Sequence, residues 1–206
     1  MEKPDKKANI LKAAEILFSE LGYEGTSTRN IAKESGANMS MINYYFGSKE
    51  GVFLDIMNQR IQDFNAQLVS INEESISPLE KLMQVIERYT QRIMCNISFH
   101  KMMHRELSLA QRPEMFCKLK DAMSSNLTFI ENIINEGIAD GSFRQVDVRM
   151  LIATIMGTVS SVATTPSKIT ADSVLDITNP KDRAILTARV VTHLKDLIKT
   201  YLTPHK

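Results

Sequence analysis

The chain has 206 residues, a formal net charge of +1 at neutral pH, 43% hydrophobic residues and 24% charged residues. These values match globular proteins and the length allows a substantial buried core, so an intrinsically disordered chain is excluded. With only 8 glycines and 6 prolines, the composition favours helices. Because the net charge is close to zero, any evidence for a nucleic-acid partner has to come from local patterns.

Targeting and membrane segments are not indicated by the sequence. Residues 1–12 are charged and lack the apolar region of a signal peptide, so we expect no secretion. The longest apolar stretch, 150–163, is interrupted by Thr, Gly and Ser and is shorter than the roughly 20 residues of a membrane span. Cys95 and Cys117 match no metal or redox spacing and suggest reduced thiols in a core. We therefore expect a cytoplasmic protein with no membrane partner.

The N-terminal part predicts three helices followed by a longer fourth helix. In each, apolar residues recur at helical spacing, and glycines or capping residues mark the ends. The first three helices are expected to run from Ile10 to Gly22, from Ser27 to Gly36 and from Met39 to Gly47, and the fourth to start at Ser48.

The remainder of the chain predicts a second set of helices. The polar segment 72–77 is expected to be a loop, since the proline that follows it favours a helix start. Residues 164–180 predict a loop with a short turn at 171–175. No segment has convincing strand periodicity, so the predicted fold class is all-α. The expected helices are Pro78–Ile97, Phe99–Leu109, Pro113–Asp140, Val146–Ala163 and Lys181–Leu202.

Residues 27–45 show the pattern of a helix, a tight glycine turn and a second helix. Gly36 is suited to the positive φ of the turn, and Ile31, Ala32 and Ile42 are placed to pack the two helices together. The second helix of such a pair fits a DNA major groove, which is about 12 Å wide, while the first lies across the backbone. The pattern predicts a DNA-binding helix-turn-helix.

The outward side chains of this motif have the chemistry of DNA contacts. Those of Thr28, Tyr45 and Lys49 suit phosphates, whereas other polar and methionine side chains suit base edges or thymine methyl groups. Alternatively, Tyr44, Tyr45 and Phe46 form an aromatic core seam. The predicted DNA-binding residues are Thr28, Arg29, Asn38, Met39, Ser40, Met41, Asn43, Tyr44, Tyr45 and Lys49.

A longer pattern surrounds the helix-turn-helix. Its residues are Ile10, Leu11, Ala13, Ala14, Leu17, Phe18, Gly22, Tyr23, Thr26, Ser27, Ile31, Ala32, Gly36 and Tyr44–Glu50. The segment from Ile10 to about Met57 resembles the DNA-binding head of the TetR family of bacterial transcription regulators. The resemblance implies a DNA-binding domain over 1–50 and a helical ligand-binding and dimerisation domain over 51–206, with 51–70 as the connecting helix. It also implies a repressor that a ligand releases from its operator.

The chain departs from the family pattern at the second helix of the motif. Asn43 stands where the family usually has tyrosine, and Ala37 and Asn38 where it has valine and serine. An asparagine in the groove can pair with N6 and N7 of adenine, so we predict an unusual operator preference. Gly51 lies early in the fourth helix, where glycine costs about 1 kcal/mol relative to alanine. We interpret it as flexibility at the helix entry.

The predicted ligand-binding and dimerisation domain has more apolar residues than its helices need for packing against one another, so a cavity for an effector is predicted. The chain has 12 methionines, which adapt to varied ligands. The alternative is an ordinary filled core, and no polar cluster identifies a ligand beyond a small apolar or amphipathic compound. The predicted lining is Phe64, Ile86, Tyr89, Ile93, Met103, Leu107, Leu127, Ile130, Ile134 and Met156.

Two helices resemble the dimer seam of the family. The helix around 147–163 carries many small residues, and the helix around 181–202 is amphipathic. The resemblance implies that they pair with their two-fold copies into a four-helix bundle, although burial within one chain would explain part of the pattern. A symmetric dimer requires recognition helices about 34 to 36 Å apart and a near-palindromic operator.

Other classes of function have weaker support. His100 and His104 are one helical turn apart, but Lys101 replaces the glutamate of a zinc-protease motif, so we expect ordinary, partly exposed histidines. No catalytic triad, phosphate loop or cofactor motif is present, and we expect no enzyme activity. Two alternatives remain. One is a DNA-organising or protein-interaction module without effector control, and the other is a helical enzyme whose active site lies in the domain over 51–206.

Overall fold

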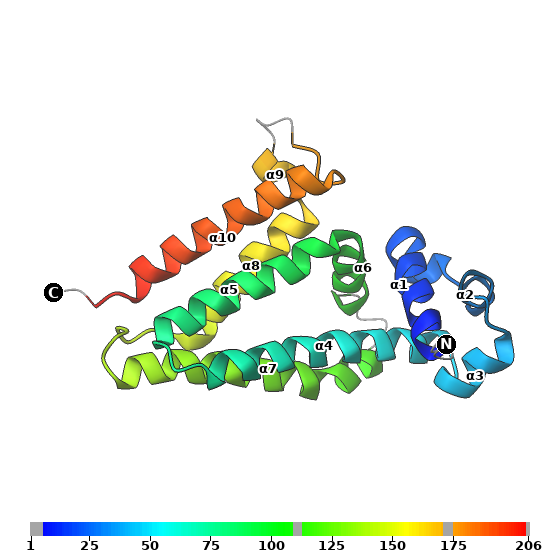
Figure 1. Cartoon of the computed structure of the whole chain (residues 1–206), viewed down its shortest axis with the longest axis horizontal. Helices are drawn as coiled ribbons and strands as arrows, with labels where there is room; N and C mark the ends of the chain where they lie inside the picture. The colour runs from blue at the N-terminus through cyan, green and yellow to red at the C-terminus, as the bar shows by residue number, and fades with distance from the viewer. Residues whose placement is uncertain (1–5, 109–112, 171–174, 205–206) are drawn as a thin grey trace. The chain divides into compact units, whose positions relative to one another are not determined.

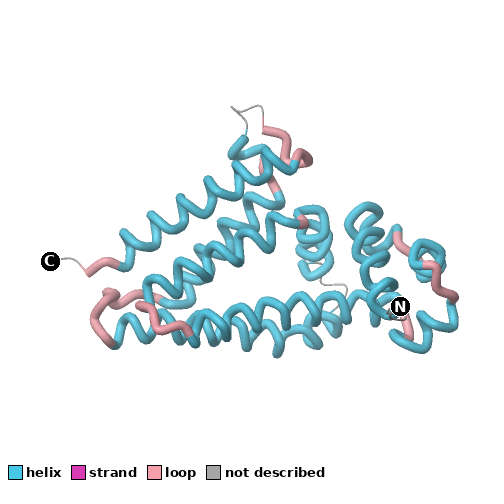
Figure 2. The backbone as a smooth tube through the Cα atoms, in the orientation of Figure 1, coloured by secondary structure: helices cyan, strands magenta, loops and turns pink. Residues whose placement is uncertain are grey.

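The computed structural model describes residues 6–108, 113–170 and 175–204, and all regular elements within them are helices (Figures 1 and 2). The predicted all-α fold class is therefore confirmed. The helices are α1 (Lys6–Gly25), α2 (Thr28–Ser35), α3 (Met39–Phe46), α4 (Lys49–Glu73), α5 (Pro78–Cys95), α6 (Ile97–Ser108), α7 (Pro113–Ala139), α8 (Val148–Thr164), α9 (Ser167–Thr170) and α10 (Pro180–Leu202).

Two helix starts follow the capping residues that the sequence indicated. Ser27 accepts a hydrogen bond from Asn30 N at 3.1 Å, and Ser48 Oγ accepts one from Gly51 N at 3.0 Å. At α5, Ser77 and Glu80 form a reciprocal capping box ahead of the first turn. The hydrogen bonds from Ser77 lower the pKa of the Glu80 carboxyl group. These side chains satisfy backbone N–H groups that would otherwise lack a partner at each helix start.

Three local predictions are corrected by the structure. Gly22, at φ 74°, interrupts α1 rather than ending it, because one more helical turn follows as far as Gly25. Part of the predicted loop after α8 forms the short α9, whose backbone N–H groups bond to the Pro166 carbonyl. The predicted turn at 171–175 lies largely outside the described residues. Both cysteines are exposed, so their predicted place in a core is wrong.

The chain forms two compact units, Met1–Asp63 with Ser98–Met123, and Phe64–Ile97 with Ser124–Lys206. The first unit extends beyond the predicted boundary at residue 50. It does so because the apolar face of α4 continues through Ile61 in the same core, to which α6 contributes Phe99. The functional boundary between 50 and 51 stays a prediction.

An aromatic cluster forms the centre of the first unit. The Phe18 and Tyr23 rings stack with centroids 5.5 Å apart, and Phe53 meets both edge-on at 5.6 and 5.3 Å. The guanidinium group of Arg60 lies 4.3 Å from the Phe99 ring centroid and is ion-paired with Glu15 of α1. This cluster fixes α1, α4 and α6 relative to one another, and so fixes the support on which the short helices pack.

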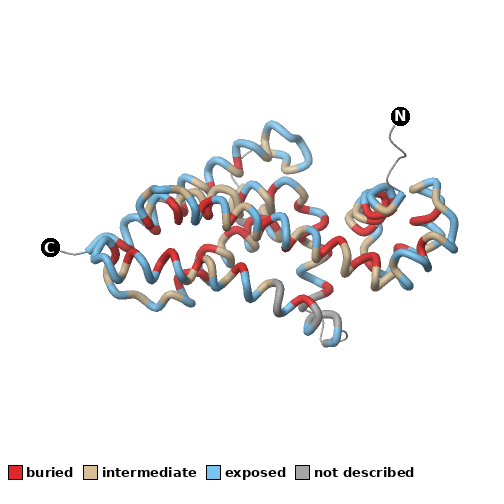
Figure 3. The backbone as a smooth tube through the Cα atoms, turned by 60° about the horizontal axis from the view of Figure 1, so that its bottom comes forward, coloured by how far each residue is buried: buried red, intermediate tan, exposed pale blue. Residues whose placement is uncertain are grey.

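The second unit is a helical bundle in which α5 packs against both α8 and α10 (Figure 1). Buried residues recur along its long helices (Figure 3), and on α10 they are Leu186, Val190, Leu194 and Ile198. This spacing of four residues places the side chains on one stripe that faces the core. No helix in the described ranges has the length and the continuous apolarity needed to cross a bilayer.

Candidate nucleic-acid interface

The turn between α2 and α3 is set by Gly36. Its φ is 65°, in the left-handed region, and its N–H faces the Lys33 carbonyl at 3.4 Å. Ala37 N then bonds to the Ala32 carbonyl at 3.0 Å, which closes the end of α2. A side chain on residue 36 would strain this conformation, whereas glycine adopts it freely. The predicted role of Gly36 is confirmed.

Helix α3 is held in place by a cap at each end and by one buried side chain. Asn38 Oδ1 accepts a hydrogen bond from Met41 N at 2.9 Å, and Gly47 N bonds to the Asn43 carbonyl at 3.0 Å. Ile42 is fully buried against Ile31 of α2, as the sequence predicted. A helix of only eight residues is unstable alone, so these contacts determine its position.

The passage from α3 to α4 depends on Gly51. A Cβ atom at this position would lie 1.9 Å from the backbone oxygen of Phe46. No side-chain movement relieves that overlap, because the atom in the way belongs to the backbone at the end of α3. The glycine therefore allows a close approach of two helices, a role that the sequence analysis did not include, and the interpretation of Gly51 as flexibility at the helix entry stays a prediction.

Most predicted DNA-binding side chains are on the surface of the first unit. Tyr44 is 83% exposed and Tyr45 40%, which excludes both from an aromatic core seam, whereas Phe46 packs against the core. The two tyrosine rings meet edge-on with centroids 5.1 Å apart. Exposed with them are Arg29, Asn38, Met39, Ser40 and Asn43, while Thr28 and Met41 are half-buried.

Lys49 has a different environment from the other predicted residues. Its ammonium group donates a hydrogen bond to the Tyr23 carbonyl at 2.9 Å and lies 4.3 Å from the centroid of the Tyr23 ring. Glu24 Oε2 is 3.8 Å away. In this structure Lys49 therefore joins the start of α4 to the end of α1, and its predicted phosphate contact stays a prediction.

Lys33 is an exposed cation on α2 that the sequence analysis did not include. It lies four residues after Arg29, so the two side chains share one face of the helix. Exposed cations are the usual partners of DNA phosphates. The signal was visible in the sequence as an Arg and a Lys at a spacing of four within the first helix of the motif.

Family models match both parts of the chain. A model described as bacterial regulatory proteins of the tetR family covers residues 10–56, and a model described as the tetracyclin repressor-like C-terminal domain covers residues 75–164. The chain belongs to the TetR family. It is accordingly a DNA-binding transcriptional regulator, and the helix-turn-helix described above is the DNA-binding part of the family.

The similarity of this TetR chain to known proteins covers most of its length. A fatty acid metabolism regulator protein of Bacillus subtilis is 26% identical over 165 residues, 80% of this chain and 84% of the relative. The repressor KstR2 of Mycolicibacterium smegmatis is 26% identical over 163 residues, 74% and 75% of the two chains. The solved structure of FadR from Bacillus subtilis in complex with stearoyl-CoA has a TM-score of 0.72 at 24% identity, covering 91% of this chain and 96% of that one.

The predicted effector residues of this TetR protein do not form one cluster. Ile86, Ile130 and Ile134 are fully buried in the core of the second unit. Around that core, Tyr89, Ile93, Leu127 and Met156 are partly buried, and the Phe64 ring is 5.8 Å from that of Tyr89. Burial raises the pKa of the Tyr89 phenol to about 12, so it stays a neutral hydrogen-bonding group. Met103 belongs to the core of the first unit, and the side chain of Leu107 lies outside the described residues.

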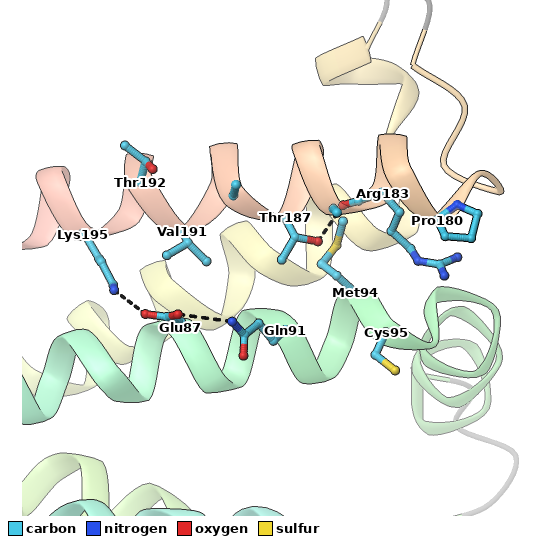
Figure 4. A pocket seen from close by; sticks show the side chains of 12 residues that line it. Glu87, Gln91, Met94, Cys95, Pro180, Arg183, Thr187, Val191, Thr192 and Lys195 are labelled. Carbon is cyan, nitrogen blue, oxygen red and sulfur yellow. Dashed lines mark hydrogen bonds and ion pairs between the residues drawn. The ribbon is translucent and has the colours of Figure 1, made fainter.

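A groove of about 560 Å³ lies between α5 and α10 in the second unit (Figure 4). Its polar side chains bond mainly to neighbours: Lys195 Nζ is 2.6 Å from Glu87 Oε2, and Gln91 Nε2 donates to Glu87 Oε1 at 3.2 Å. Thr187 Oγ1 donates to the Arg183 carbonyl at 2.7 Å. None of the predicted effector residues lines this groove, so the two regions are separate candidates for ligand contacts.

The two histidines of α6 have unequal environments. His100 is buried with 6% exposure, contrary to the expectation of partial exposure, whereas His104 is exposed. Burial, with His104 and Arg60 nearby, lowers the pKa of His100 to about 4. No group of three His, Cys, Asp or Glu side chains suited to a metal ion occurs within the part of the chain that the structure describes.

Proposed function

We propose that this regulator is a cytoplasmic repressor that binds a near-palindromic operator as a homodimer and is released by a small effector. The observation that supports the proposal most strongly is the exposed polar surface of α3 beside Gly36, within a segment that the family model covers. It is not proposed to be an enzyme. The family consists of regulatory proteins, and the sequence carries no catalytic motif.

The proposed DNA surface divides into phosphate and base contacts. Helix α2 would lie across the backbone through Thr28 and Lys33, with Arg29 on the same face as Lys33 and within reach of a base edge. Lys49 would reach a phosphate by exchanging its bond to the Tyr23 carbonyl. The exposed face of α3 would enter the major groove. Its proposed base contacts are Met39, Ser40, Met41, Asn43 and Tyr44, whereas Tyr45 would reach a phosphate and Asn38 would cap the helix that carries them.

The proposed dimer interface is the apolar face shared by α8 and α10. Met150 is 63% exposed, and Leu197 and Tyr201 are 42% and 44% exposed. These three side chains surround a hollow of about 280 Å³ together with Leu151, Thr154 and Ile198. Contiguous exposed apolar groups of this kind are typical of a helix-pair interface, and two-fold symmetry would double the surface.

The proposed effector site is in the second unit, at the edge of its core. Tyr89, Ile93, Leu127 and Met156 are only partly buried and would line the opening, while the residues behind them form filled packing. A long, apolar ligand with one polar end suits a methionine-containing, largely apolar lining with a single neutral phenol. Since a fatty acid metabolism regulator is among its relatives, a long-chain acyl-CoA is the first candidate effector.

The test is binding of the purified protein to DNA flanking its own gene, with base-resolved footprinting. Arg29→Ala should weaken binding about tenfold or more, because one phosphate or base contact is lost. Arg88→Ala removes the same charge from α5 in the other unit, where Arg88 lies outside the proposed DNA and dimer surfaces, and should leave binding unchanged. No protected site in any duplex would contradict the regulator assignment.

The effector part is tested separately with stearoyl-CoA added to the protein–DNA complex. Release of the DNA, together with loss of that release in Tyr89→Phe or Met156→Ala, is the expected result. If no acyl-CoA released the protein from its DNA, the proposal of an acyl-CoA effector would be contradicted. That result would favour the alternative of a DNA-organising module without effector control if other small molecules also failed.

A further inference from the structure

The surface with which α3 can read bases is limited by the side chains that hold the fold. Ile42 is fully buried and Phe46 packs against the core. Asn38 uses its carbonyl oxygen to accept a hydrogen bond from Met41 N at 2.9 Å. A bidentate contact to adenine needs both that oxygen and the amide nitrogen, so the cap competes with base recognition at this residue.

The residues that remain free on α3 carry no charge. Residues 38–46 contain no Lys, Arg, Asp or Glu. The nearest cation in the sequence, Lys49, is bonded to the Tyr23 carbonyl and lies over the Tyr23 ring. Guanine presents two acceptors, N7 and O6, in the major groove, and bidentate Arg or Lys is its commonest specific partner. Helix α3 lacks such a partner for guanine.

The free side chains of α3 match the edges of A·T base pairs instead. Within the described residues, the exposed amide of Asn43 makes no side-chain hydrogen bond to the protein, so both of its polar atoms are available. An asparagine amide pairs with N6 and N7 of adenine. Met39, 39% exposed, lies four residues before Asn43 and therefore on the same face of the helix. Its apolar side chain suits the thymine methyl group.

We propose that the operator positions read by α3 are A·T base pairs and that Asn43 specifies an adenine among them. Any guanine contact in the half-site comes from Arg29 of α2, which is exposed and outside this helix. This inference rests on the proposed function, since it names the DNA sequence class that the same surface binds. It also assigns Asn38 to holding the helix rather than to reading a base.

The test is selection of duplexes from a random library by the purified full-length protein, followed by sequencing. The expected motif is a near-palindrome whose positions under α3 are A·T pairs. Asn43→Ala should reduce discrimination roughly tenfold or more at one base pair in each half-site. Asn43→Arg should change the preferred base at that position to guanine.

Asn38→Ala is the matched control, because it removes the same amide from the other end of α3. It should weaken binding to all sequences by a similar factor and leave the base preference unchanged. Guanine enriched under α3 with the wild-type protein, or an adenine preference that survives Asn43→Ala, would overturn the inference and leave the regulator assignment intact. If the wild-type protein enriches no sequence, the proposed function fails, and this inference fails with it.

Discussion

The two compact units both expose large apolar side chains, but in different surroundings. In the first unit, Met39, Tyr44 and Tyr45 are exposed beside Ser40 and Asn43, which are polar and exposed. This mixture of apolar surface, amide and hydroxyl groups matches the edges of bases and the sugar-phosphate backbone. A surface of this composition is suited to DNA rather than to another protein core.

In the second unit three exposed apolar residues have mainly apolar neighbours. Met150 of α8 and Leu197 and Tyr201 of α10 border one hollow, whose other lining residues are Leu151, Thr154 and Ile198. A surface of this composition offers little hydrogen bonding and is suited to a second copy of the same helices. The comparison teaches that exposed apolar residues indicate a partner, and that their neighbours indicate its chemistry.

The largest effect is expected where the apolar face of the second unit is broken. Leu197→Glu would bury a carboxylate in the proposed two-fold interface, next to its symmetry copy, and should weaken self-association at least a hundredfold. Operator affinity should fall with it, since one head contacts only one half-site. Sedimentation at micromolar concentration measures the proportions of monomer and dimer. The control is Thr192→Glu, which adds the same charge to α10 beside the α5–α10 groove and should leave the protein a dimer. If the Leu197→Glu variant were still a dimer, the interface would have to lie elsewhere.

A smaller but substantial effect is expected within the first unit. Gly51→Ala forces a Cβ atom against the Phe46 carbonyl, where only 1.9 Å is available, and should lower the free energy of unfolding by about 3 kcal/mol. Urea denaturation measures the change. Gln62→Ala is the control in the same helix, because Gln62 is exposed and the change only removes side-chain atoms. That variant should be as stable as the wild type or slightly more stable. Equal stability of the two variants would refute the steric role of Gly51.

The cap of α3 should have an effect of about 1 kcal/mol. Asn38→Ala removes the acceptor for Met41 N, and losing an N-cap residue typically lowers stability by this amount. Thermal unfolding of Asn38→Ala and Asn43→Ala separates a structural asparagine from a DNA-reading one. The second variant should unfold at the wild-type temperature. A stability loss confined to Asn43→Ala would reverse the two assignments.

The smallest effect concerns pH. His100 has a pKa of about 4 in the folded protein and an ordinary value of 6.5, so between these values the unfolded chain binds more protons. Stability contributed by the neutral ring is complete above pH 6.5 and is lost as the pH falls. Between pH 7 and pH 6 the wild type should lose about 0.7 kcal/mol more than His100→Gln. His193→Gln, at an exposed site on α10, should show the wild-type loss; an equal loss in His100→Gln would mean that another group titrates.

The sequence alone determined the fold class, the helix starts and the helix-turn-helix. These features depend on local physics: Ser27, Asn38 and Ser77 cap the helices that follow them, and Gly36 takes the left-handed conformation that the turn needs. The spacing of apolar residues predicted which face of each helix is buried, as at Ile31 and Ile42. Such signals act over a few residues and are visible without knowledge of the distant neighbours.

Only the tertiary structure decided which of the candidate side chains are free to act. Lys49 and Tyr44 both appear as polar surface residues in the sequence, yet Lys49 is bonded to the Tyr23 carbonyl, 26 positions earlier, and Tyr44 is exposed. Gly51 is required because α3 ends close to its backbone, and Met103 lies in a different core from Ile86. These outcomes depend on contacts between residues far apart in the chain, which periodicity and capping signals do not encode.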